Sequence, residues 1–325
     1  MTDPIAAPNA VRASARGRVI DIVAPSGYVE DPMRVSRALA HLRELGHRVE
    51  NVEATQRRYL RFAGTDAERA SDINALADPN RALPDLAIAL RGGYGAVRLL
   101  HGLDYARLGE RLRAHPVPMI GHSDFTALQM ALYAKAGLIT FGGPMLGTDF
   151  GAQTPNAFTM RNFWGILQQP SYTVSGSESG QPDADVSGTL WGGNLAMLSS
   201  LMGTPYMPAV DGGILFVEDV GEQPFRVERM LYQLHLSGVL QRQRALLLGH
   251  FTQQRTTAYD NGFDMPAVVR QMREVIGIPV ITGLPFGHVE EMLTLPVGAN
   301  ASLKAGRHDA RGAFSLTVSD YPCLS

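Results

Sequence analysis

The sequence predicts an α/β protein whose first part is built on a parallel, doubly wound sheet. Short apolar segments alternate with amphipathic helical segments up to about Thr148, which is typical of parallel sheets covered by helices. The segment Leu86–Leu90 is apolar at every position, as expected for a strand that is buried on both faces. A second alternating section begins at Gly188. Two such sections in a chain of 325 residues indicate two domains.

The first section contains five predicted strands, each stopped by glycine, proline or a polar turn. They are residues 18–23, 47–52, 86–90, 117–120 and 138–141. Between the first two strands, apolar residues at helical spacing predict a helix that ends at Gly46. Thr65 and Glu68 have the spacing of a capping box for a second helix, which reaches about Ala77.

We expect four segments along the chain. They are a flexible N-terminal extension (1–16), an N-terminal α/β domain (17–165), a polar, Gly/Ser-rich linker region (166–187) and a C-terminal domain (188–325). In the last segment, apolar runs predict strands at 214–217, 245–251 and 280–282. A helix is expected from Pro224 to Gly238, and short β-structure is expected near the end of the chain.

The composition excludes several kinds of protein and site. Hydrophobic residues make up 45% of the chain and charged residues 18%, which is typical of globular domains. The net charge is −2, so no overall field favours nucleic acid or a membrane surface. The single cysteine, Cys323, and the absence of an H-E-x-x-H motif predict neither a metal nor another cofactor. Because the sequence lacks a signal-like or membrane-spanning apolar run, we expect a cytoplasmic protein.

The stretch around Ser123 reads as a strand, a tight turn and a helix. An apolar run ends at Ile120, the turn is Gly121-His-Ser-Asp124, and helical spacing follows from Thr126. Such a turn exposes a serine hydroxyl beside the backbone N–H groups of a new helix, which suits attack on a carbonyl. The turn lacks the second glycine of G-x-S-x-G, and serines commonly cap helices. The motif therefore leaves both roles open.

A nucleophilic serine needs a base and a group that orients the base. His288 lies in a glycine-rich turn after a predicted strand, whereas His122 directly adjoins the serine and is expected to be a wall residue. Glu218 stands where a buried strand ends, with Asp219 and Glu222 as rivals for the orienting role. Each of these side chains also has a simple structural reading, as a satisfied loop histidine or a strand-end charge.

The glycine-rich loop Arg91–Gly95 follows the third predicted strand. The carboxyl ends of parallel strands meet at one edge of the sheet, so we expect this loop and the Ser123 turn to share one crevice. Its glycines let the backbone approach a ligand, and one of their N–H groups would stabilise an oxyanion beside that of Asp124. The loop lacks the G-x-G-x-x-G spacing of a dinucleotide site.

Several stretches together resemble the LD-carboxypeptidases of serine peptidase family S66. They occur in the family's order and cover nearly everything from residue 18 onward: residues 22–28, 91–96, 121–126, 189–197, 224–231 and 281–288. The resemblance implies a flavodoxin-like or class I glutamine-amidotransferase-like N-terminal domain and a smaller, swivelling β/α C-terminal domain. It also implies a Ser123–His288–Glu218 triad split between the domains, and an oxyanion hole made of the N–H groups of Gly93 and Asp124.

The activity that this resemblance implies is metal-free hydrolysis of a peptide. The family removes the terminal D-Ala from L-Ala-D-Glu-meso-diaminopimelate-D-Ala during cytoplasmic recycling of cell-wall muropeptides, typically as a homodimer. An exocarboxypeptidase must bind a free carboxylate, a role that suits arginine. Arg91 and Arg226 are candidates, although either is also a plausible structural ion pair. Further substrate-binding candidates are Tyr94, Trp191 and Asn194.

Two other functions remain open on the sequence. One is a microcin-immunity-type hydrolase, which uses the same triad on an aminoacyl-nucleotide amide and needs an aromatic residue to stack the nucleobase. Trp191 is a candidate for stacking, but its Thr-Leu-Trp-Gly-Gly-Asn setting is more similar to that of the peptidases. The other is a binding module without chemistry, against which the presence of all three triad candidates argues.

Overall fold

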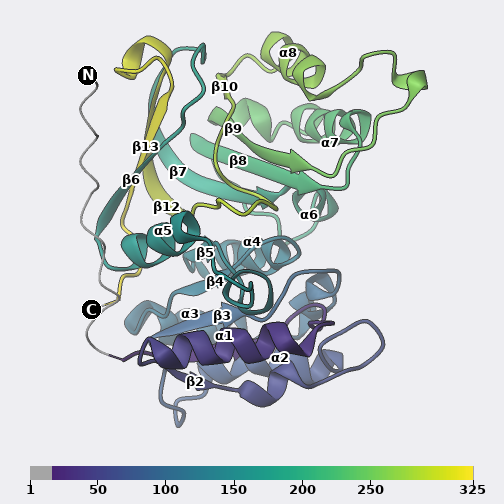
Figure 1. The fold of residues 1–325 in the computed structure, drawn as a ribbon. Helices are drawn as coiled ribbons and strands as arrows, with labels where there is room; N and C mark the ends of the chain where they lie inside the picture. Colours follow the sequence, from purple (N-terminus) through teal and green to yellow (C-terminus); the bar gives the residue numbers. More distant parts are fainter. Residues whose placement is uncertain (1–16, 325) are drawn as a thin grey trace, which may run out of the picture.

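The computed structural model describes residues 17–324, so the extension expected over residues 1–16 lies outside the described part. Within the described residues the chain forms a six-stranded and a seven-stranded sheet. Figure 1 shows the first sheet with its helices in the lower half and the second sheet in the upper half. The last described residue, Leu324, returns to the N-terminal part of the chain, where its N–H donates to the Leu167 carbonyl at 2.6 Å.

The first sheet has the strand order β11-β5-β4-β3-β1-β2. Strands β1 to β5 pair in parallel, which confirms the prediction from the alternating pattern. The strands are β1 (Val19–Val23), β2 (Arg48–Glu50), β3 (Leu86–Ala89), β4 (Met119–Gly121) and β5 (Thr140–Gly142). The helices are α1 (Pro32–Glu44), α2 (Asp66–Asn74), α3 (Tyr105–Ala114), α4 (Phe125–Ala136) and α5 (Ala157–Leu167).

Local sequence signals account for several of these helix ends. The predicted capping box of α2 is confirmed, because Thr65 accepts from the Glu68 N–H and Glu68 accepts from the Thr65 N–H. Asp31 caps α1 before Pro32, and Gly46 follows the helix with a φ of 85°. Helix α4 differs from both, since it is buried on nearly every side and therefore reads as apolar rather than amphipathic.

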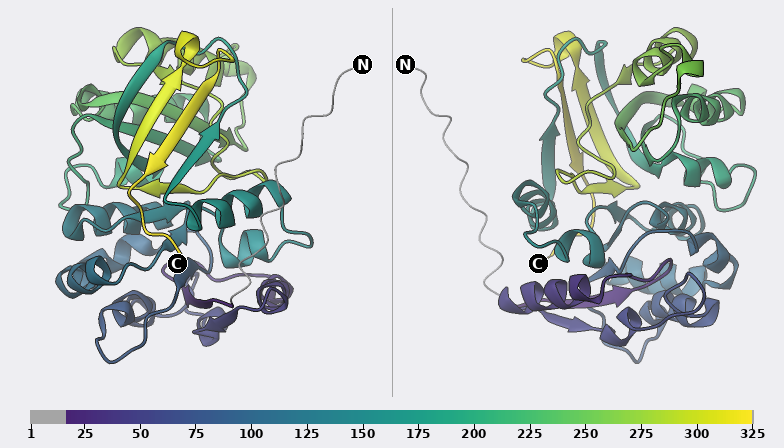
Figure 2. Two further views of the ribbon diagram at one scale, coloured as in Figure 1. Left: turned by 90° about the vertical axis from the view of Figure 1, so that its left-hand side faces the viewer. Right: turned by 45° about the vertical axis from the view of Figure 1, so that its right-hand side comes forward.

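The second sheet has the order β10-β9-β8-β7-β12-β13-β6. Its first four strands are parallel and the rest are antiparallel. Figure 2 shows α7 and α8 covering one face of this sheet. The elements are β6 (Ser171–Ser175), β7 (Ala184–Asn194), α6 (Leu195–Ser200), β8 (Gly213–Val220), α7 (Pro224–Leu236), β9 (Gln243–Thr252), α8 (Met265–Val275), β10 (Val280–Ile281), β12 (Ala299–Ala305) and β13 (Phe314–Ser319).

The segment 166–187 differs from the expected linker, because it contributes β6 and the start of β7 to the second sheet. Strand β6 is an edge strand that pairs only with β13, and it buries only Val174. An edge strand that exposes most of its side chains can be polar, so its sequence has no apolar run to reveal it.

One strand from the C-terminal part joins the first sheet. Strand β11 (Leu295–Val297) pairs antiparallel with β5, with Pro296 opposite Phe141. The sequence predicted β-structure here but assigned all of residues 188–325 to the C-terminal domain. The chain therefore crosses between the two sheets three times instead of once, because after the His288 segment it returns to the first sheet for β11 and then goes back to the second for β12 and β13.

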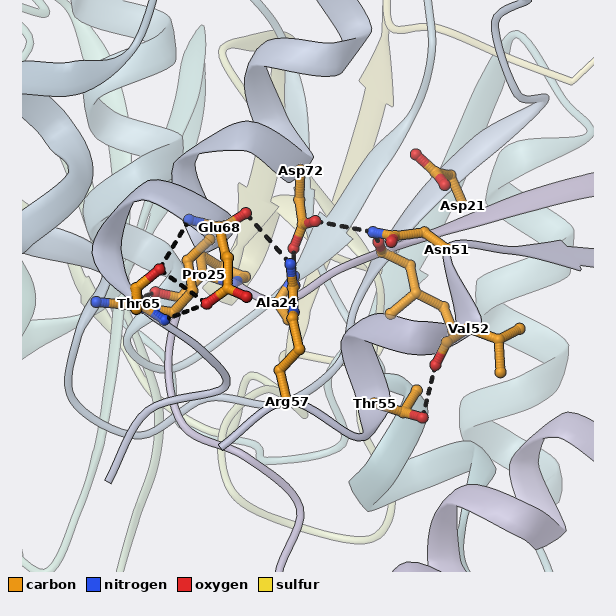
Figure 3. Close-up of polar contacts among 12 residues, drawn as sticks. Asp21, Ala24, Pro25, Asn51, Val52, Thr55, Arg57, Thr65, Glu68 and Asp72 are labelled. Carbon is orange, nitrogen blue, oxygen red and sulfur yellow. Dashed lines mark hydrogen bonds and ion pairs between the residues drawn. The ribbon is translucent and has the colours of Figure 1, made fainter. Parts of the chain in front are cut away.

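A buried carboxylate on α2 holds the carboxyl ends of β1 and β2 together (Figure 3). Asp72 accepts from the Ala24 N–H at 3.1 Å and from Asn51 Nδ2 at 2.9 Å, and it pairs with the Arg57 guanidinium. The same Asn51 amide donates to the Ile22 carbonyl at 2.6 Å. This network fixes the start of the loop after β1 at the carboxyl edge of the first sheet.

We expect Asp72→Ala to lower the free energy of unfolding by about 3 kcal/mol, because it leaves a half-buried guanidinium and buried donors without an acceptor. The exposed Asp211, which pairs with Arg242 at the surface, provides the matched control. Asp211→Ala should change the free energy by less than about 0.5 kcal/mol. Urea unfolding of both variants measures the difference, and equal stabilities would show that the network contributes little.

Candidate active site

A cavity of about 550 Å³ opens between the two halves of the chain, beyond the carboxyl ends of β3 and β4. The predicted sharing of one crevice is confirmed, because both the Arg91 loop and the Ser123 turn line it. Its wall consists of Arg34, Arg91, Gly92, Gly93, His122, Ser123, Met145, Thr148, Asp149, Ala152, Thr154, Asn156, Thr159, Gly287, His288, Val289 and Glu290.

Ser123 lies on a strained turn between β4 and α4, as the sequence predicted. Its φ is 63°, in the left-handed region that non-glycine residues seldom adopt. The Thr126 N–H donates to the Ser123 carbonyl at 2.9 Å, which starts the next helix. A Cβ on Gly92 would lie 2.9 Å from the Ser123 Cβ, so only glycine leaves room for the serine side chain there.

His288 and Glu218 form a hydrogen-bonded pair from two different elements. His288 Nδ1 lies 2.8 Å from Glu218 Oε2, at the end of β8, and the Glu218 side chain is fully buried. Burial alone would lower the pKa of His288, but the hydrogen bond and charge of Glu218, with Asp219 and Asp149, raise it above its ordinary value. Bonding at Nδ1 leaves Nε2 as the atom that can exchange a proton.

Asn194 and Asp219 support this pair from behind. Asn194 Nδ2 donates to Glu218 Oε1 at 3.2 Å and to Asp219 Oδ1 at 3.0 Å. Asp219 also accepts from the Ala196 N–H at 2.9 Å, at the start of α6. Burial raises the pKa of Asp219 to about 6. Three carboxylates are candidates for the orienting role. Glu218 contacts His288, whereas Asp219 contacts Asn194 and the Ala196 N–H, and Glu222 forms an ion pair with Arg226.

His122 is part of the cavity wall, as expected, and is nearly buried. Its Nδ1 lies 3.0 Å from the Gly143 carbonyl, and its ring centroid lies 5.1 Å from that of His288. Burial is the main cause that lowers the pKa of His122. The ring is therefore neutral near pH 7, with Nδ1 as the donor to the carbonyl.

The two predicted oxyanion donors have free N–H groups. Among residues 17–324, neither the Gly93 nor the Asp124 N–H donates to a protein acceptor. Gly93 lines the cavity with a φ of 81°. The Asp124 carboxylate points away from the cavity and accepts from Ser26 Oγ at 2.6 Å and from the Ala96 N–H at 2.7 Å. Asp124 thereby connects the Ser123 turn to the loops after β1 and β3.

Comparisons with known proteins identify the family of the chain. The family profile for the LD-carboxypeptidase N-terminal domain matches residues 20–143, and that for the LD-carboxypeptidase C-terminal domain matches residues 187–303. The chain belongs to the LD-carboxypeptidase family S66. It is therefore a serine carboxypeptidase by family.

Relatives within the family cover almost the whole chain. A probable murein peptide carboxypeptidase of Bacillus subtilis is 30% identical over 92% of this chain and 92% of its own length. The Escherichia coli microcin C7 self-immunity protein MccF is 30% identical over 83% of this chain and 85% of its own. The crystal structure of muramoyltetrapeptide carboxypeptidase from Oxalobacter formigenes has a TM-score of 0.85 and 45% identity, and the match covers 94% of this chain and 99% of that chain.

Of the five substrate-binding candidates, only Arg91 lies in the cavity wall that the described residues form. Arg91 lines the cavity and donates to the Tyr28 carbonyl at 2.7 Å. Arg226 lies on a different surface with Glu222, and Tyr94 is 47% exposed beside the cavity but outside its wall. Trp191 is buried in the core, where its Nε1 donates to Gln243, and Asn194 contacts Glu218. Both of these differ from the expectation, because their β7 positions face the interior.

Sequence reasoning missed three charged residues in the cavity wall. Arg34 comes from α1, Asp149 from the turn after β5, and Glu290 from the loop after His288. Asp149 follows no apolar strand directly, and Arg34 lies on a helix whose sequence is unremarkable. Only the packing of α1 against residues 146–150 brings the first two together, so no local signal could have identified them.

We expect Asp124→Ala to lower kcat about a hundredfold while KM changes little. The variant retains its backbone N–H but releases Ser26 and the Ala96 loop, so the two oxyanion donors lose their fixed separation. Steady-state kinetics on the family's tetrapeptide substrate measures the effect. Ser26→Ala, which removes one of the two hydrogen bonds, should give a smaller loss. An unchanged kcat in folded Asp124→Ala would show that the carboxylate does not position the site.

The activity should decline as pH falls through the raised pKa of His288, because only the neutral imidazole accepts a proton. The midpoint of the acid limb of kcat/KM should therefore lie above about 6.5, the ordinary value for histidine. Glu218→Gln should move this limb to lower pH, since it removes the charge that raises the pKa. Glu222→Gln, outside the cavity, should leave the limb in place. A rate that is constant from pH 5 to 8 would exclude a histidine base.

Proposed function

We propose that this protein is a serine LD-carboxypeptidase that releases the terminal D-Ala from L-Ala-D-Glu-meso-diaminopimelate-D-Ala in muropeptide recycling. The observation that carries the proposal is the joint placement of Ser123 and the 2.8 Å His288–Glu218 pair on one cavity. The named carboxypeptidases among the relatives support the same class of substrate.

In the proposed reaction, His288 accepts the proton of the Ser123 hydroxyl as its oxygen attacks the carbonyl of the diaminopimelate L-centre. The N–H groups of Gly93 and Asp124 stabilise the oxyanion, while buried Glu218 stabilises the imidazolium. His288 then protonates the amine of the departing D-Ala, which leaves an acyl-enzyme. Water, deprotonated by His288, hydrolyses the ester and restores Ser123.

Ser123 and His288 both line the cavity but, within the described residues, are not hydrogen-bonded to each other. Catalytic hydrogen bonds are often long before substrate binds and shorten in the Michaelis complex. Arg91, which adjoins Gly92 and Gly93 in the wall, is our candidate for binding the terminal carboxylate.

A nucleotide-amide substrate is the second candidate, because MccF is also similar to this chain. The wall of the cavity, as far as residues 17–324 form it, contains no Trp, Tyr or Phe on which a nucleobase could stack. Trp191, the residue suggested for stacking, is 1% exposed. These observations favour the peptide substrate.

We also propose that the protein acts in the cytoplasm as a homodimer, as the family resemblance implies. In the part of the chain that the structure describes, no helix is long and apolar enough to cross a membrane. Sedimentation velocity of the purified protein would test the dimer directly.

We expect wild-type protein to convert the diaminopimelate tetrapeptide to tripeptide, with a mass loss of one alanine residue. Ser123→Ala and His288→Ala should each reduce the rate by a factor of at least about 10³, because triad residues act as a unit. Mass spectrometry of timed reactions provides the measurement.

Circular dichroism should confirm that both variants are folded. Cleavage of an aminoacyl sulfamoyl adenosine but not of the tetrapeptide would favour the nucleotide-amide function. Tight binding of the tetrapeptide without any cleavage would support a binding module instead.

A further inference from the structure

The wall of the active-site cavity contains two charged side chains, Arg34 and Asp149, that form no ion pair within the described residues. Among residues 17–324, neither Arg34 nor Asp149 takes part in an ion pair, although Arg37 and Arg91 on the same side of the molecule do. Both Arg34 and Asp149 are only partly exposed. Charged groups held in this way in a cavity are poised to bind a ligand of opposite charge.

The two groups are neighbours on a fixed part of the wall. Arg34 Nη2 donates to the Thr148 carbonyl at 3.4 Å, so its guanidinium lies beside the residue that precedes Asp149. The turn itself is anchored to the first sheet, because the Gly147 N–H donates to the Leu90 carbonyl at 2.9 Å. The positions of the cation and the anion are therefore set by backbone contacts.

Among the described residues, only one of the two carboxylate oxygens of Asp149 accepts hydrogen bonds. Its Oδ2 accepts from the Met145 N–H at 2.8 Å and from Thr148 Oγ1 at 2.6 Å. Among the described residues, Oδ1 accepts no hydrogen bond. The charge of Asp149 acts on the pKa of both His122 and His288. Asp149 lines the same cavity as Ser123 and His288, so its free oxygen is available to the side chain of a bound acyl residue.

We propose that Arg34 and Asp149 form a subsite for an amino-acid head group at the end of the substrate side chain, with Asp149 binding the ammonium and Arg34 the carboxylate. This inference rests on the proposed function and specifies which peptides the site prefers. The D-centre of meso-diaminopimelate carries both charges on one carbon. Lysine retains the ammonium but lacks the carboxylate, so it satisfies only Asp149.

The competing assignment places the terminal carboxylate of D-Ala on Arg34. The two assignments predict different results with the lysine peptide, because that peptide has the same terminal carboxylate as the diaminopimelate peptide. Under that assignment, loss of Arg34 would lower kcat/KM equally for both peptides. Under our proposal it lowers kcat/KM only for the diaminopimelate peptide, which has the second carboxylate.

The test compares kcat/KM for three tetrapeptides that carry diaminopimelate, lysine or ε-acetyl-lysine at the third position. Wild type should prefer diaminopimelate over lysine, and lysine over acetyl-lysine, by about tenfold to a hundredfold at each step. Arg34→Gln should reduce the rate with diaminopimelate to that with lysine and leave the lysine rate unchanged. Asp149→Asn should reduce kcat/KM for the diaminopimelate and lysine peptides toward the value for the acetyl-lysine peptide. The value for the acetyl-lysine peptide should itself change little.

Arg37→Gln is the matched control. Arg37 also lies on α1 and donates to the Gly151 carbonyl at 3.0 Å, two residues after Asp149, but it does not line the cavity. This variant should keep the wild-type order of preference. Arg34→Lys, which retains the charge but not the planar guanidinium, should keep part of the preference for diaminopimelate. Asp149→Asn also changes the pH profile through His288, but ratios between substrates at one pH cancel that effect.

Equal loss of activity on all peptides in Arg34→Gln, or no preference in wild type, would overturn the subsite. Failure of the proposed function gives a different result, since wild type would then release D-Ala from none of the peptides. In that case calorimetry with Ser123→Ala protein still ranks the diaminopimelate and lysine peptides by affinity. Equal affinities there would overturn the subsite independently of catalysis.

Discussion

The contact between Thr126 and Asn194 links the two halves of the candidate active site. Thr126 lies three residues after Ser123, and its Oγ1 accepts from the Asn194 N–H at 3.0 Å. The Asn194 side chain in turn donates to Glu218, which holds His288. A short series of hydrogen bonds thus connects the helix after Ser123 to Glu218, the residue that contacts His288. Thr126, Asn194 and Glu218 do not line the cavity.

Close packing makes this contact rigid. A Cβ on Gly193 would lie 2.5 Å from Thr126 Oγ1, and the residue has a φ of 142°, so glycine is needed for both space and conformation. Asn194 is the donor between two adjacent buried carboxylates, Glu218 and Asp219. Neighbouring like charges in a buried site require such donors. A motion that separated the two halves at this point would therefore also disturb the base.

Much of the fold and the triad candidates could be predicted because their signals are local. Strands β1 and β3, the capping box at Thr65 and the turn at Ser123 depend on neighbouring residues. Glu218 lies near the end of the apolar strand β8, and His288 lies in the glycine-rich loop after β10. The family resemblance selected Glu218 among the three carboxylates, and in the structure Glu218 lies 2.8 Å from His288. The remaining features depend on long-range packing: polar β6 needed its partner β13, and the interior position of Trp191 depends on which face of β7 is covered.

Strand β11 has a consequence for how the chain can be divided. It follows the His288 segment in sequence but completes the edge of the first sheet beside β5. A fragment that ended near residue 165 would keep the pairing of β5 with β4 but lack β11, so the other edge of β5 would be unpaired. Exposed strand edges of this kind promote aggregation. The two family profiles divide the chain by sequence, but the first sheet contains strands from both matched segments. His288 is carried on a segment whose far end is fixed to the sheet from which the Ser123 turn emerges.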